Sequence, residues 1–311
     1  NIEDEKLKNC EALSEWPLVS PQLMHFLEWS AAYTLSPLGT FARMALPIAD
    51  VTRPTPQQTR YRLVHAGTTR NDKQQKVVDL LSKGGLFTRT EIREATGVSD
   101  AVIKTLIDQG VLEAVKVSAE QELPEMPETA TIQLPAYNPE QQAAAQELIH
   151  RVDERAFSVT LLDGVTGSGK TEVYFAAVKQ ALAKGEQVLI LMPEIALTTQ
   201  LVTRFTKRFG IAPVTWHSHL TPAQRRRHLK AIVHGQARVV LGARSALFLP
   251  YKELGLLIID EEHDGSYKQE EGIFYNARDL AIKPAQLENR PIILVSATPS
   301  LETYHNAQSG R

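Results

Sequence analysis

The stretch GVTGSGKT, residues 164–171, decides the fold of this chain. It fits the pattern G-x-x-x-x-G-K-[ST], and it stands between an apolar segment at residues 157–162 and a helical pattern at residues 172–183. A strand, a glycine-rich turn and a helix in this order are typical of a phosphate-binding loop, because glycines let backbone N–H groups curl around phosphate oxygens. The stretch therefore predicts a nucleotide-binding site at the end of a buried strand.

Each chemical group of this loop has a predicted task. Lys170 is expected to reach the outer phosphates, and the Thr171 hydroxyl is placed to ligate Mg²⁺. The predicted nucleotide-binding residues in this stretch are Gly164, Val165, Thr166, Gly167, Ser168, Gly169, Lys170 and Thr171.

Further apolar segments follow the loop, at residues 187–192, 237–241, 256–260 and 291–296, and helical patterns separate them. Alternation at this spacing predicts an α/β fold in which helices cover both faces of a parallel sheet. Ligands of such sheets bind beyond the carboxyl ends of the strands. We therefore expect a parallel-sheet P-loop NTPase lobe whose chemistry lies at one edge of the sheet.

The turn Asp-Glu-Glu-His follows the apolar segment that ends at Asp260. A carboxylate at this strand end can hold Mg²⁺, and Glu261 is the natural group to orient and deprotonate an attacking water. His263 would link the nucleotide to other motifs. The alternative interpretation of the whole segment is an acidic turn on the protein surface. The predicted catalytic residues are Lys170, Asp260, Glu261 and His263, with Thr171 and Asp260 as the Mg²⁺ ligands.

The composition of the chain limits the kinds of protein that it can be. The chain has 311 residues, 43% of them hydrophobic and 23% charged, with a formal net charge of −2. This is ordinary globular composition, enough for about two domains, and nothing resembles a membrane span. Because the charge is balanced, any binding to nucleic acid must use local basic patches.

The single cysteine, Cys10, cannot form an internal disulfide or a thiolate metal cluster, which fits a reducing compartment. The chain starts at Asn1, and its first turn is charged where a signal peptide would be apolar. We therefore expect a cytosolic protein cut from something longer.

Residues 51–118 predict a small winged-helix domain. Capping and glycine signals delimit three helices, at residues 71–83, 88–97 and 99–110, and an alternating strand follows at residues 111–117. Such a domain can place its third helix in a DNA groove or serve as a protein contact or spacer. The basic side chains that could touch DNA are Lys104, Arg89 and Arg93.

Several smaller expectations concern single residues. Phe26, Trp29 and Tyr33 have helical spacing and are expected in a core. The basic run at residues 225–230 predicts a solvated helix face, with a DNA-tracking patch as the alternative. We also expect Pro284 to interrupt a helix. His217 and His219 lack further ligands nearby and are expected to be loop histidines rather than a metal site.

The phosphate loop, Asp-Glu-x-His and Ser-Ala-Thr at residues 296–298 occur in the motif order of superfamily 2 helicases. The segments GARSALF (242–248), IDEEHDGSYK (259–268), YNARDLA (275–281) and SATPSLET (296–303) closely resemble the primosomal protein N′ family of bacterial replication-restart helicases. In that family a domain that binds the 3′ end of a nascent strand and a winged helix precede the first RecA-like lobe.

The resemblance implies four segments in this chain. They are a C-terminal remnant of the 3′-end DNA-binding domain at residues 1–50, a winged helix at 51–118, an acidic linker at 119–135 and the first RecA-like helicase lobe at 136–311. The second lobe, its arginine finger and the family's zinc segment are not among these residues. We therefore expect this polypeptide alone to hydrolyse ATP slowly or not at all.

The resemblance also implies residue roles. Gln141 would read the adenine edge, and strand-end loops would contact the backbone of single-stranded DNA. The loop at residues 265–278 resembles an aromatic-rich loop that couples DNA binding to ATP hydrolysis. The alternative for this loop is that its aromatic side chains only pack it onto the lobe. The alternative for Arg244 is an internal salt bridge. The implied DNA-binding residues are Pro193, Glu194, Arg244, Ser245, Tyr267, Lys268, Phe274, Tyr275 and Arg278.

The implied function is that of an ATP-dependent 3′-to-5′ DNA helicase that starts primosome assembly at stalled forks. It implies ATP and Mg²⁺ as cofactors, forked and single-stranded DNA as ligands, primosome and single-strand-binding proteins as partners, and a monomer in the bacterial cytoplasm. Two alternatives stay open: another superfamily 2 nucleic-acid motor, and a branched-DNA or protein docking module with a vestigial ATPase.

Overall fold

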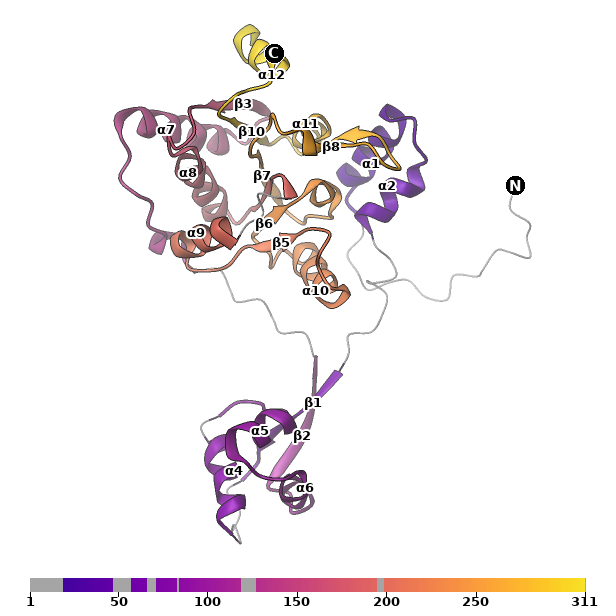
Figure 1. The fold of residues 1–311 in the computed structure, drawn as a ribbon, viewed down its shortest axis with the longest axis vertical. Helices are drawn as coiled ribbons and strands as arrows, with labels where there is room; N and C mark the ends of the chain where they lie inside the picture. The colour runs from indigo at the N-terminus through magenta and orange to yellow at the C-terminus, as the bar shows by residue number, and fades with distance from the viewer. Residues whose placement is uncertain are drawn as a thin grey trace, which may run out of the picture. The chain divides into compact units, whose positions relative to one another are not determined.

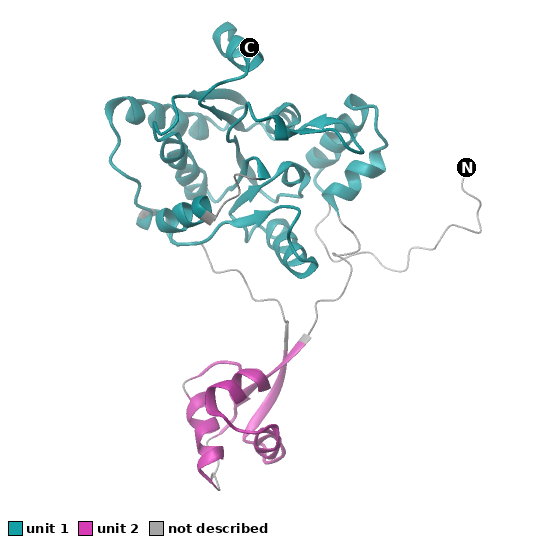
Figure 2. Cartoon of the chain, in the orientation of Figure 1, with its two compact units in different colours: residues 1–52, 123–311 teal, residues 53–122 magenta. Residues whose placement is uncertain are grey.

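The computed structural model describes residues 19–46, 57–65, 71–82, 84–118, 127–194 and 199–310. The expectations for Cys10, for the charged first turn and for residues 119–126 of the acidic linker lie outside these residues. The chain forms two compact units, one from residues 1–52 and 123–311 and the other from residues 53–122 (Figure 2). The second unit is thus an insertion in the first.

A six-stranded parallel sheet forms the centre of the first unit, and the predicted α/β lobe is confirmed (Figure 1). The strand order is β3-β10-β7-β4-β6-β5. The strands are β3 (Ser158–Asp163), β4 (Gln187–Leu191), β5 (Val214–Trp216), β6 (Val239–Gly242), β7 (Leu254–Ile259) and β10 (Pro291–Ser296). The short strand β5 was not predicted.

The register of the sheet brings the ends of the motif-bearing strands to one edge. Ser296 of β10 pairs with Asp163 of β3, and Leu294 of β10 pairs with Ile259 of β7. Ile259 in turn pairs with Leu191 of β4 on its other side. The turns that follow these four strands therefore lie side by side at the carboxyl edge, as parallel pairing requires.

Helices cover both faces of the sheet, as expected. Successive residues of β4 alternate between the two cores, with Leu189 in one and Ile190 in the other. One face packs against α7 (Pro139–Glu154), α8 (Lys170–Ala183) and α9 (Thr199–Phe209). The other packs against α10 (Pro222–Val233), the 3₁₀ turn η4 (Arg244–Phe248) and α11 (Ala277–Leu287), and α12 (Leu301–Ser309) follows β10.

Two N-terminal helices complete the second of these cores. They are α1 (Pro21–Tyr33) and α2 (Leu38–Ala45). Phe26 stacks on Phe248 of η4 at a centroid distance of 5.4 Å, and Phe41 lies 5.3 Å from the same ring. Both phenylalanines are buried in the core of the lobe, so residues 19–46 pack as part of it.

Several single-residue expectations were wrong. Tyr33 is 63% exposed because it lies on the solvent side of α1, where it stacks on Trp29. Helix α11 continues through Pro284, whose ring is buried, so packing compensates for the missing N–H. His228 of the basic run is buried and its Nδ1 lies 2.8 Å from the Thr215 carbonyl oxygen.

The inserted unit contains the three predicted helices and the predicted strand. They are α4 (Asp72–Ser82), α5 (Arg89–Thr96), α6 (Asp100–Asp108) and β2 (Leu112–Ser118). The capping box of Thr88 and Glu91 is present at the start of α5. Strand β1 (Gln57–Leu63), which pairs with β2 in antiparallel fashion, was not predicted. The winged-helix identity of this unit stays a prediction.

The packed chain of the lobe begins before residue 136. The short 3₁₀ turn η2 (Thr129–Thr131) precedes Ile132, which is buried in the core beside α8. Lys179 Nζ donates a hydrogen bond of 2.7 Å to the Ile132 carbonyl. The end of the predicted linker is therefore part of the lobe. None of the described helices is both long and apolar enough to cross a membrane.

Candidate nucleotide and nucleic-acid site

The phosphate loop connects β3 to the N-terminus of α8. Gly167 and Gly169 have φ angles of +82° and +87°, which a side chain would strain. Lys170 Nζ donates hydrogen bonds to the carbonyls of Gly164 at 2.5 Å and Val165 at 3.2 Å. The lysine ammonium and the positive end of a 14-residue helix thus face the same loop, which favours an anionic ligand.

Gln141 of α7 contacts this loop directly. Its Nε2 donates to the Ser168 carbonyl at 2.8 Å, and its Oε1 accepts from the Asn138 N–H at 3.0 Å. A Cβ on Gly169 would lie 2.7 Å from Gln141 Nε2, so glycine is needed for this approach. The structure therefore places Gln141 at the nucleotide loop, and its role in reading adenine stays a prediction.

Asp260 follows β7 and is held by two tyrosines, of which the sequence did not single out Tyr174 and pointed to Tyr267 for a different role. Tyr174 of α8 donates its hydroxyl to Asp260 Oδ2 at 2.9 Å, and Tyr267 donates to the Asp260 carbonyl at 2.5 Å. Burial raises the pKa of Asp260, and the Tyr174 hydrogen bond opposes this change. Tyr174 follows Thr171 by one helical turn, and this spacing is the only sequence signal for it.

The residues near Asp260 fit Mg²⁺. The buried carboxylate accepts hydrogen bonds from uncharged groups, namely Tyr174 and the Glu261 N–H. The Thr171 side chain lies close to the same Tyr174 hydroxyl, which brings two hard oxygen ligands to one place. The described residues contain no group of three or more acidic, histidine or cysteine ligands. One carboxylate and one hydroxyl suit a Mg²⁺ that also binds phosphates, whose charge it would neutralise.

Glu261 has a left-handed backbone conformation with φ at +51°. For a residue with a side chain this conformation costs about 1–3 kcal/mol of free energy. Its carboxylate is 45% exposed, and Oε2 lies 3.7 Å from His263 Nδ1. Such strain persists only where surrounding contacts fix the backbone. The turn therefore presents Glu261 outward at the carboxyl edge of the sheet.

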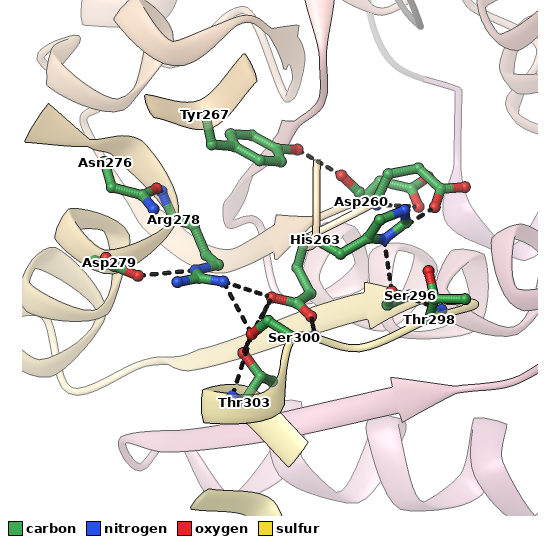
Figure 3. Close-up of polar contacts among 12 residues, drawn as sticks. Asp260, His263, Tyr267, Asn276, Arg278, Asp279, Ser296, Thr298, Ser300 and Thr303 are labelled. Carbon is green, nitrogen blue, oxygen red and sulfur yellow. Dashed lines mark hydrogen bonds and ion pairs between the residues drawn. The ribbon is translucent and has the colours of Figure 1, made fainter. Parts of the chain in front are cut away.

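His263 links the acidic turn to the Ser-Ala-Thr segment, and its predicted link to the nucleotide stays a prediction. Its Nδ1 lies 2.7 Å from Ser296 Oγ, which also accepts from the Thr298 N–H at 3.1 Å (Figure 3). The Ser296 carbonyl accepts a 3.3 Å hydrogen bond from the Gly164 N–H. Ser296 therefore touches the phosphate loop through its backbone and the acidic turn through its side chain.

The structure contradicts two of the predicted DNA contacts. Tyr267 and Tyr275 are only 1% and 5% exposed, so their ring faces cannot stack on bases. Tyr275 packs against Phe248, and burial raises its pKa to about 12. Arg278 turns inward, where its side chain is 16% exposed and pairs with Glu262. For the two tyrosines the alternative interpretation, packing of the loop onto the lobe, is correct.

Other predicted DNA contacts remain accessible. Phe274, between β8 (Lys268–Gln269) and β9 (Tyr275–Asn276), is 68% exposed. Lys268 is exposed and pairs with Glu270 at 2.8 Å. The DNA roles of Phe274 and Lys268 stay predictions.

The strand-end residues are fixed by contacts within the lobe. Glu194, which follows Pro193 after β4, accepts a 2.9 Å hydrogen bond from the Ser218 N–H, and the Ser218 hydroxyl bond lowers its pKa. Arg244, which precedes Ser245 in η4, donates a 2.6 Å hydrogen bond to the Lys268 carbonyl. These contacts hold the strand-end loops in place, and their binding of a DNA backbone stays a prediction.

Comparisons with known proteins agree with this geometry. Residues 1–47 match a 3′ DNA-binding domain family. The chain is 36% identical over its whole length to the replication restart protein PriA of Haemophilus influenzae, of which it spans 44%. It is 41% identical over 76% of its length to PriA of Bacillus subtilis, and 55% identical over 49% of its length to PriA of Rickettsia conorii, and it spans 30% and 24% of these relatives.

The chain thus spans less than half the length of each of these relatives. Residues 138–307, which include the whole sheet and all of its strand-end motifs, match the DEAD/DEAH box helicases. The chain belongs to the DEAD/DEAH box helicase family.

Proposed function

We propose that the intact protein is an ATP-dependent 3′-to-5′ DNA helicase of replication restart and that this chain carries its first motor lobe. The observation that carries the proposal is the convergence of the phosphate loop, the acidic turn and Ser296 at the ends of β3, β7 and β10. A nucleotide there would touch all three segments. The similarity to replication restart proteins supports the choice among helicases.

The proposed catalytic roles follow from the contacts. Lys170 binds the outer phosphates, while Thr171 and Asp260 hold Mg²⁺, which neutralises phosphate charge when bound. Glu261 is exposed enough to orient and deprotonate a water molecule, and His263 fixes the acidic turn against Ser296. These groups together suit phosphoryl transfer from ATP to water.

The proposed ligands are forked and single-stranded DNA. The match of residues 1–47 to a 3′ DNA-binding domain supports this choice, because α1 and α2 pack on the same lobe as the nucleotide loop. Primosome and single-strand-binding proteins are the proposed partners, in the bacterial cytoplasm. Zinc is proposed only for the rest of the intact protein.

The test compares ATP hydrolysis by the intact protein with forked DNA, single-stranded DNA, plain duplex and RNA, and compares unwinding of substrates with 3′ and 5′ overhangs. We expect stimulation by single-stranded and forked DNA and unwinding from 3′ overhangs only. The Lys170→Ala variant is the matched control and should lose hydrolysis. Stimulation by RNA or by plain duplex alone would indicate another superfamily 2 motor. Normal replication restart with Lys170→Ala would indicate a docking module.

A further inference from the structure

One stretch of the lobe contains positive charges and no negative ones. Between Glu194 and Glu253 the chain has no aspartate or glutamate, but it has ten lysines and arginines. The whole chain has a formal net charge of −2, so its excess of positive charge is concentrated in this stretch. An anionic partner would therefore be attracted here rather than to the protein as a whole.

Several of these cations already have contacts within the lobe. Arg204 and Arg208 of α9 pair with Glu172 at 3.2 Å and 3.1 Å. Arg238 and Arg244 donate hydrogen bonds to the backbone carbonyls of Gly185 and Lys268. These four side chains hold the lobe together, and the positive charge that is left for a partner lies elsewhere in the stretch.

Three consecutive arginines of α10 have no such contacts. Arg225, Arg226 and Arg227 are partly exposed, and none of them forms an ion pair within the part of the chain that the structure describes. The guanidinium carbon of Arg225 lies 5.7 Å from the centroid of the Trp216 ring. The Nε atoms of Arg226 and Arg227 are buried and have no hydrogen-bond partner among the described residues. Packing rather than ion pairing therefore holds these three charges, which together form what we call the α10 surface.

The next residue of the helix does not offset this charge. His228 is buried, and its Nδ1 lies 2.8 Å from the Thr215 carbonyl oxygen. Burial lowers the pKa of His228, and the positive charge of Arg227 lowers it further. The structure thus keeps an uncharged ring beneath the arginines, where a carboxylate would have neutralised them.

The position of α10 in the fold places this surface far from the nucleotide loop. The helix follows β5, which lies at the opposite end of the strand order from β3 (Figure 1). Because neighbouring strands lie about 4.8 Å apart, five strand spacings separate β5 from β3 by about 24 Å. Trp216, which Arg225 covers, is the last residue of β5, and the Ser218 N–H donates to Glu194 in the loop after β4. The α10 surface therefore continues the carboxyl edge of the sheet away from the ATP chemistry.

The chemistry of the α10 surface suits phosphate groups rather than bases. A guanidinium group can donate two parallel hydrogen bonds to phosphate oxygens. Among the described residues between Val165 and Phe274, no large apolar side chain is exposed, so this part of the lobe offers no ring on which an unpaired base could stack. Contact with phosphates alone is what a DNA duplex offers to a surface that does not enter its grooves.

We propose that Arg225, Arg226 and Arg227 form a phosphate-binding surface for the duplex arm of a forked DNA. This site is separate from the strand-end loops proposed for the single strand. The inference goes beyond the proposed function, because it concerns where a duplex lies on the lobe and does not require ATP hydrolysis.

The test measures binding of the intact protein to two fluorescent DNAs over a range of salt concentrations. One is a fork with a duplex arm, and the other is a single strand as long as the unpaired arm of the fork. Arg226→Gln and Arg227→Gln should each weaken fork binding by about five- to tenfold at about 0.1 M salt. Each should also reduce the slope of the logarithm of the binding constant against the logarithm of salt concentration by about 0.9, the value for one duplex phosphate contact. Binding of the single strand should change by less than about twofold.

A matched control removes one positive charge elsewhere on the lobe. Arg151 of α7 is partly exposed and pairs with Glu147 at 2.7 Å and Glu154 at 3.2 Å. Arg151→Gln should leave the affinity for the fork and the salt slope unchanged, because its charge is already neutralised. Arg226→Lys and Arg227→Lys keep the charge and should keep the salt slope.

The melting temperature shows whether the variants fold. Neither Arg226 nor Arg227 donates a hydrogen bond through Nε to the described residues, so replacement with glutamine costs no such bond and should not lower the melting temperature. Weaker fork binding in a variant with an unchanged melting temperature would therefore report the loss of a DNA contact.

Three results would overturn the inference. Equal weakening by Arg151→Gln would show that only the net charge of the lobe matters. Equal weakening of fork and single-strand binding would assign the α10 surface to the single strand. Fork binding and a salt slope that neither glutamine variant alters would show that no phosphate lies there. In contrast, the expected loss of fork binding in a protein that hydrolyses no ATP with any DNA would refute the proposed function and leave this inference standing.

Discussion

His263 Nδ1 lies 2.7 Å from Ser296 Oγ, and this bond joins the turn after β7 to the end of β10 across 33 residues of chain. Ser296 is fully buried, so no bulk water replaces a lost partner. The bond therefore links two motifs whose strands are neighbours in the sheet.

Ser296→Ala removes this bond while keeping the backbone contact to the phosphate loop. A hydrogen bond is worth about 1 kcal/mol, so we expect about a fivefold loss in kcat for DNA-stimulated ATP hydrolysis by the intact protein. ATP affinity should not change. Ser158→Ala, at the other end of the sheet on β3, is the control and should leave kcat unaltered. Equal effects of the two variants would contradict a role for the bond.

Tyr174→Phe removes the hydroxyl that donates to Asp260. A hydrogen bond to a charged group is worth about 1.5 kcal/mol or more, so we expect about tenfold weaker ATP binding in the presence of Mg²⁺ and little change without it. Calorimetric titration of the chain with and without Mg²⁺ measures both. Tyr251→Phe removes another buried hydroxyl, which donates to the Ala246 carbonyl, and should change neither affinity.

Phe41→Ala tests whether the N-terminal helices are integral to the lobe. The ring is 0% exposed and packs against Phe248, so its removal should lower the free energy of unfolding by about 3–5 kcal/mol, measured by urea denaturation. Leu35→Ala, at a residue that is 94% exposed, should change it by less than about 0.5 kcal/mol. A Phe41 variant as stable as the Leu35 variant would mean that α2 packs only loosely.

Two glycines should respond in opposite ways to alanine. A Cβ on Gly242 would approach the Ala246 Cβ closer than two carbon atoms can, so Gly242→Ala should destabilise the chain by about 1–3 kcal/mol. Gly39 lies in α2, and a Cβ there meets no atom within 4 Å. Gly39→Ala should stabilise the chain by about 0.5–1 kcal/mol through helix propensity. Thermal or urea unfolding compares the two.

Glu91 gives the inserted unit a pH dependence. The Thr88 N–H donates to its carboxylate at 2.7 Å and lowers the pKa of Glu91 from its ordinary value of 4.5. The pKa of Glu91 is lower in the folded state than in the unfolded state. The carboxylate therefore stabilises the fold fully at a pH above its unfolded-state pKa, and this stabilisation is lost as the pH falls through its folded-state pKa. NMR titration of the carboxyl gives the pKa directly.

Substitution checks the origin of that pH dependence. Glu91→Gln keeps an acceptor but does not titrate, so the loss of stability of α5 between about pH 5 and 3 should become smaller. Glu94→Gln, on the same helix but outside the capping box, should leave that loss in place. An unchanged pH profile in Glu91→Gln would show that other groups dominate.

The sequence predicted the sheet well where apolar runs end at polar turns. Residues 291–296 were predicted as a strand and form β10 with the same bounds. The phosphate loop and the acidic turn were placed at strand ends because parallel strands of such folds carry their polar residues there. Strand β5 was missed because its three residues are too few to show a period.

The remaining errors concern contacts between distant segments. Tyr267 and Tyr275 lie in a loop whose composition is typical of base stacking. Whether a ring faces solvent or the core depends, however, on what packs against it. The ring of Tyr275 packs against Phe41 and Phe248. The burial of Glu262 by Ser300 and Thr303 likewise joins segments about 40 residues apart and leaves no local pattern. Strand β1 was missed because Pro54 and Pro56 directly precede it, and prolines at this spacing are typical of irregular chain.

The pairing of β1 with β2 brings the entrance and exit of the inserted unit together, with Gln57 opposite Ser118. A segment whose two ends meet in this way can be exchanged, shortened or lost in evolution without pulling apart the unit that surrounds it. Selection on whatever the insert recognises can therefore proceed independently of selection on ATP chemistry, and relatives with a conserved motor lobe are free to differ in this module.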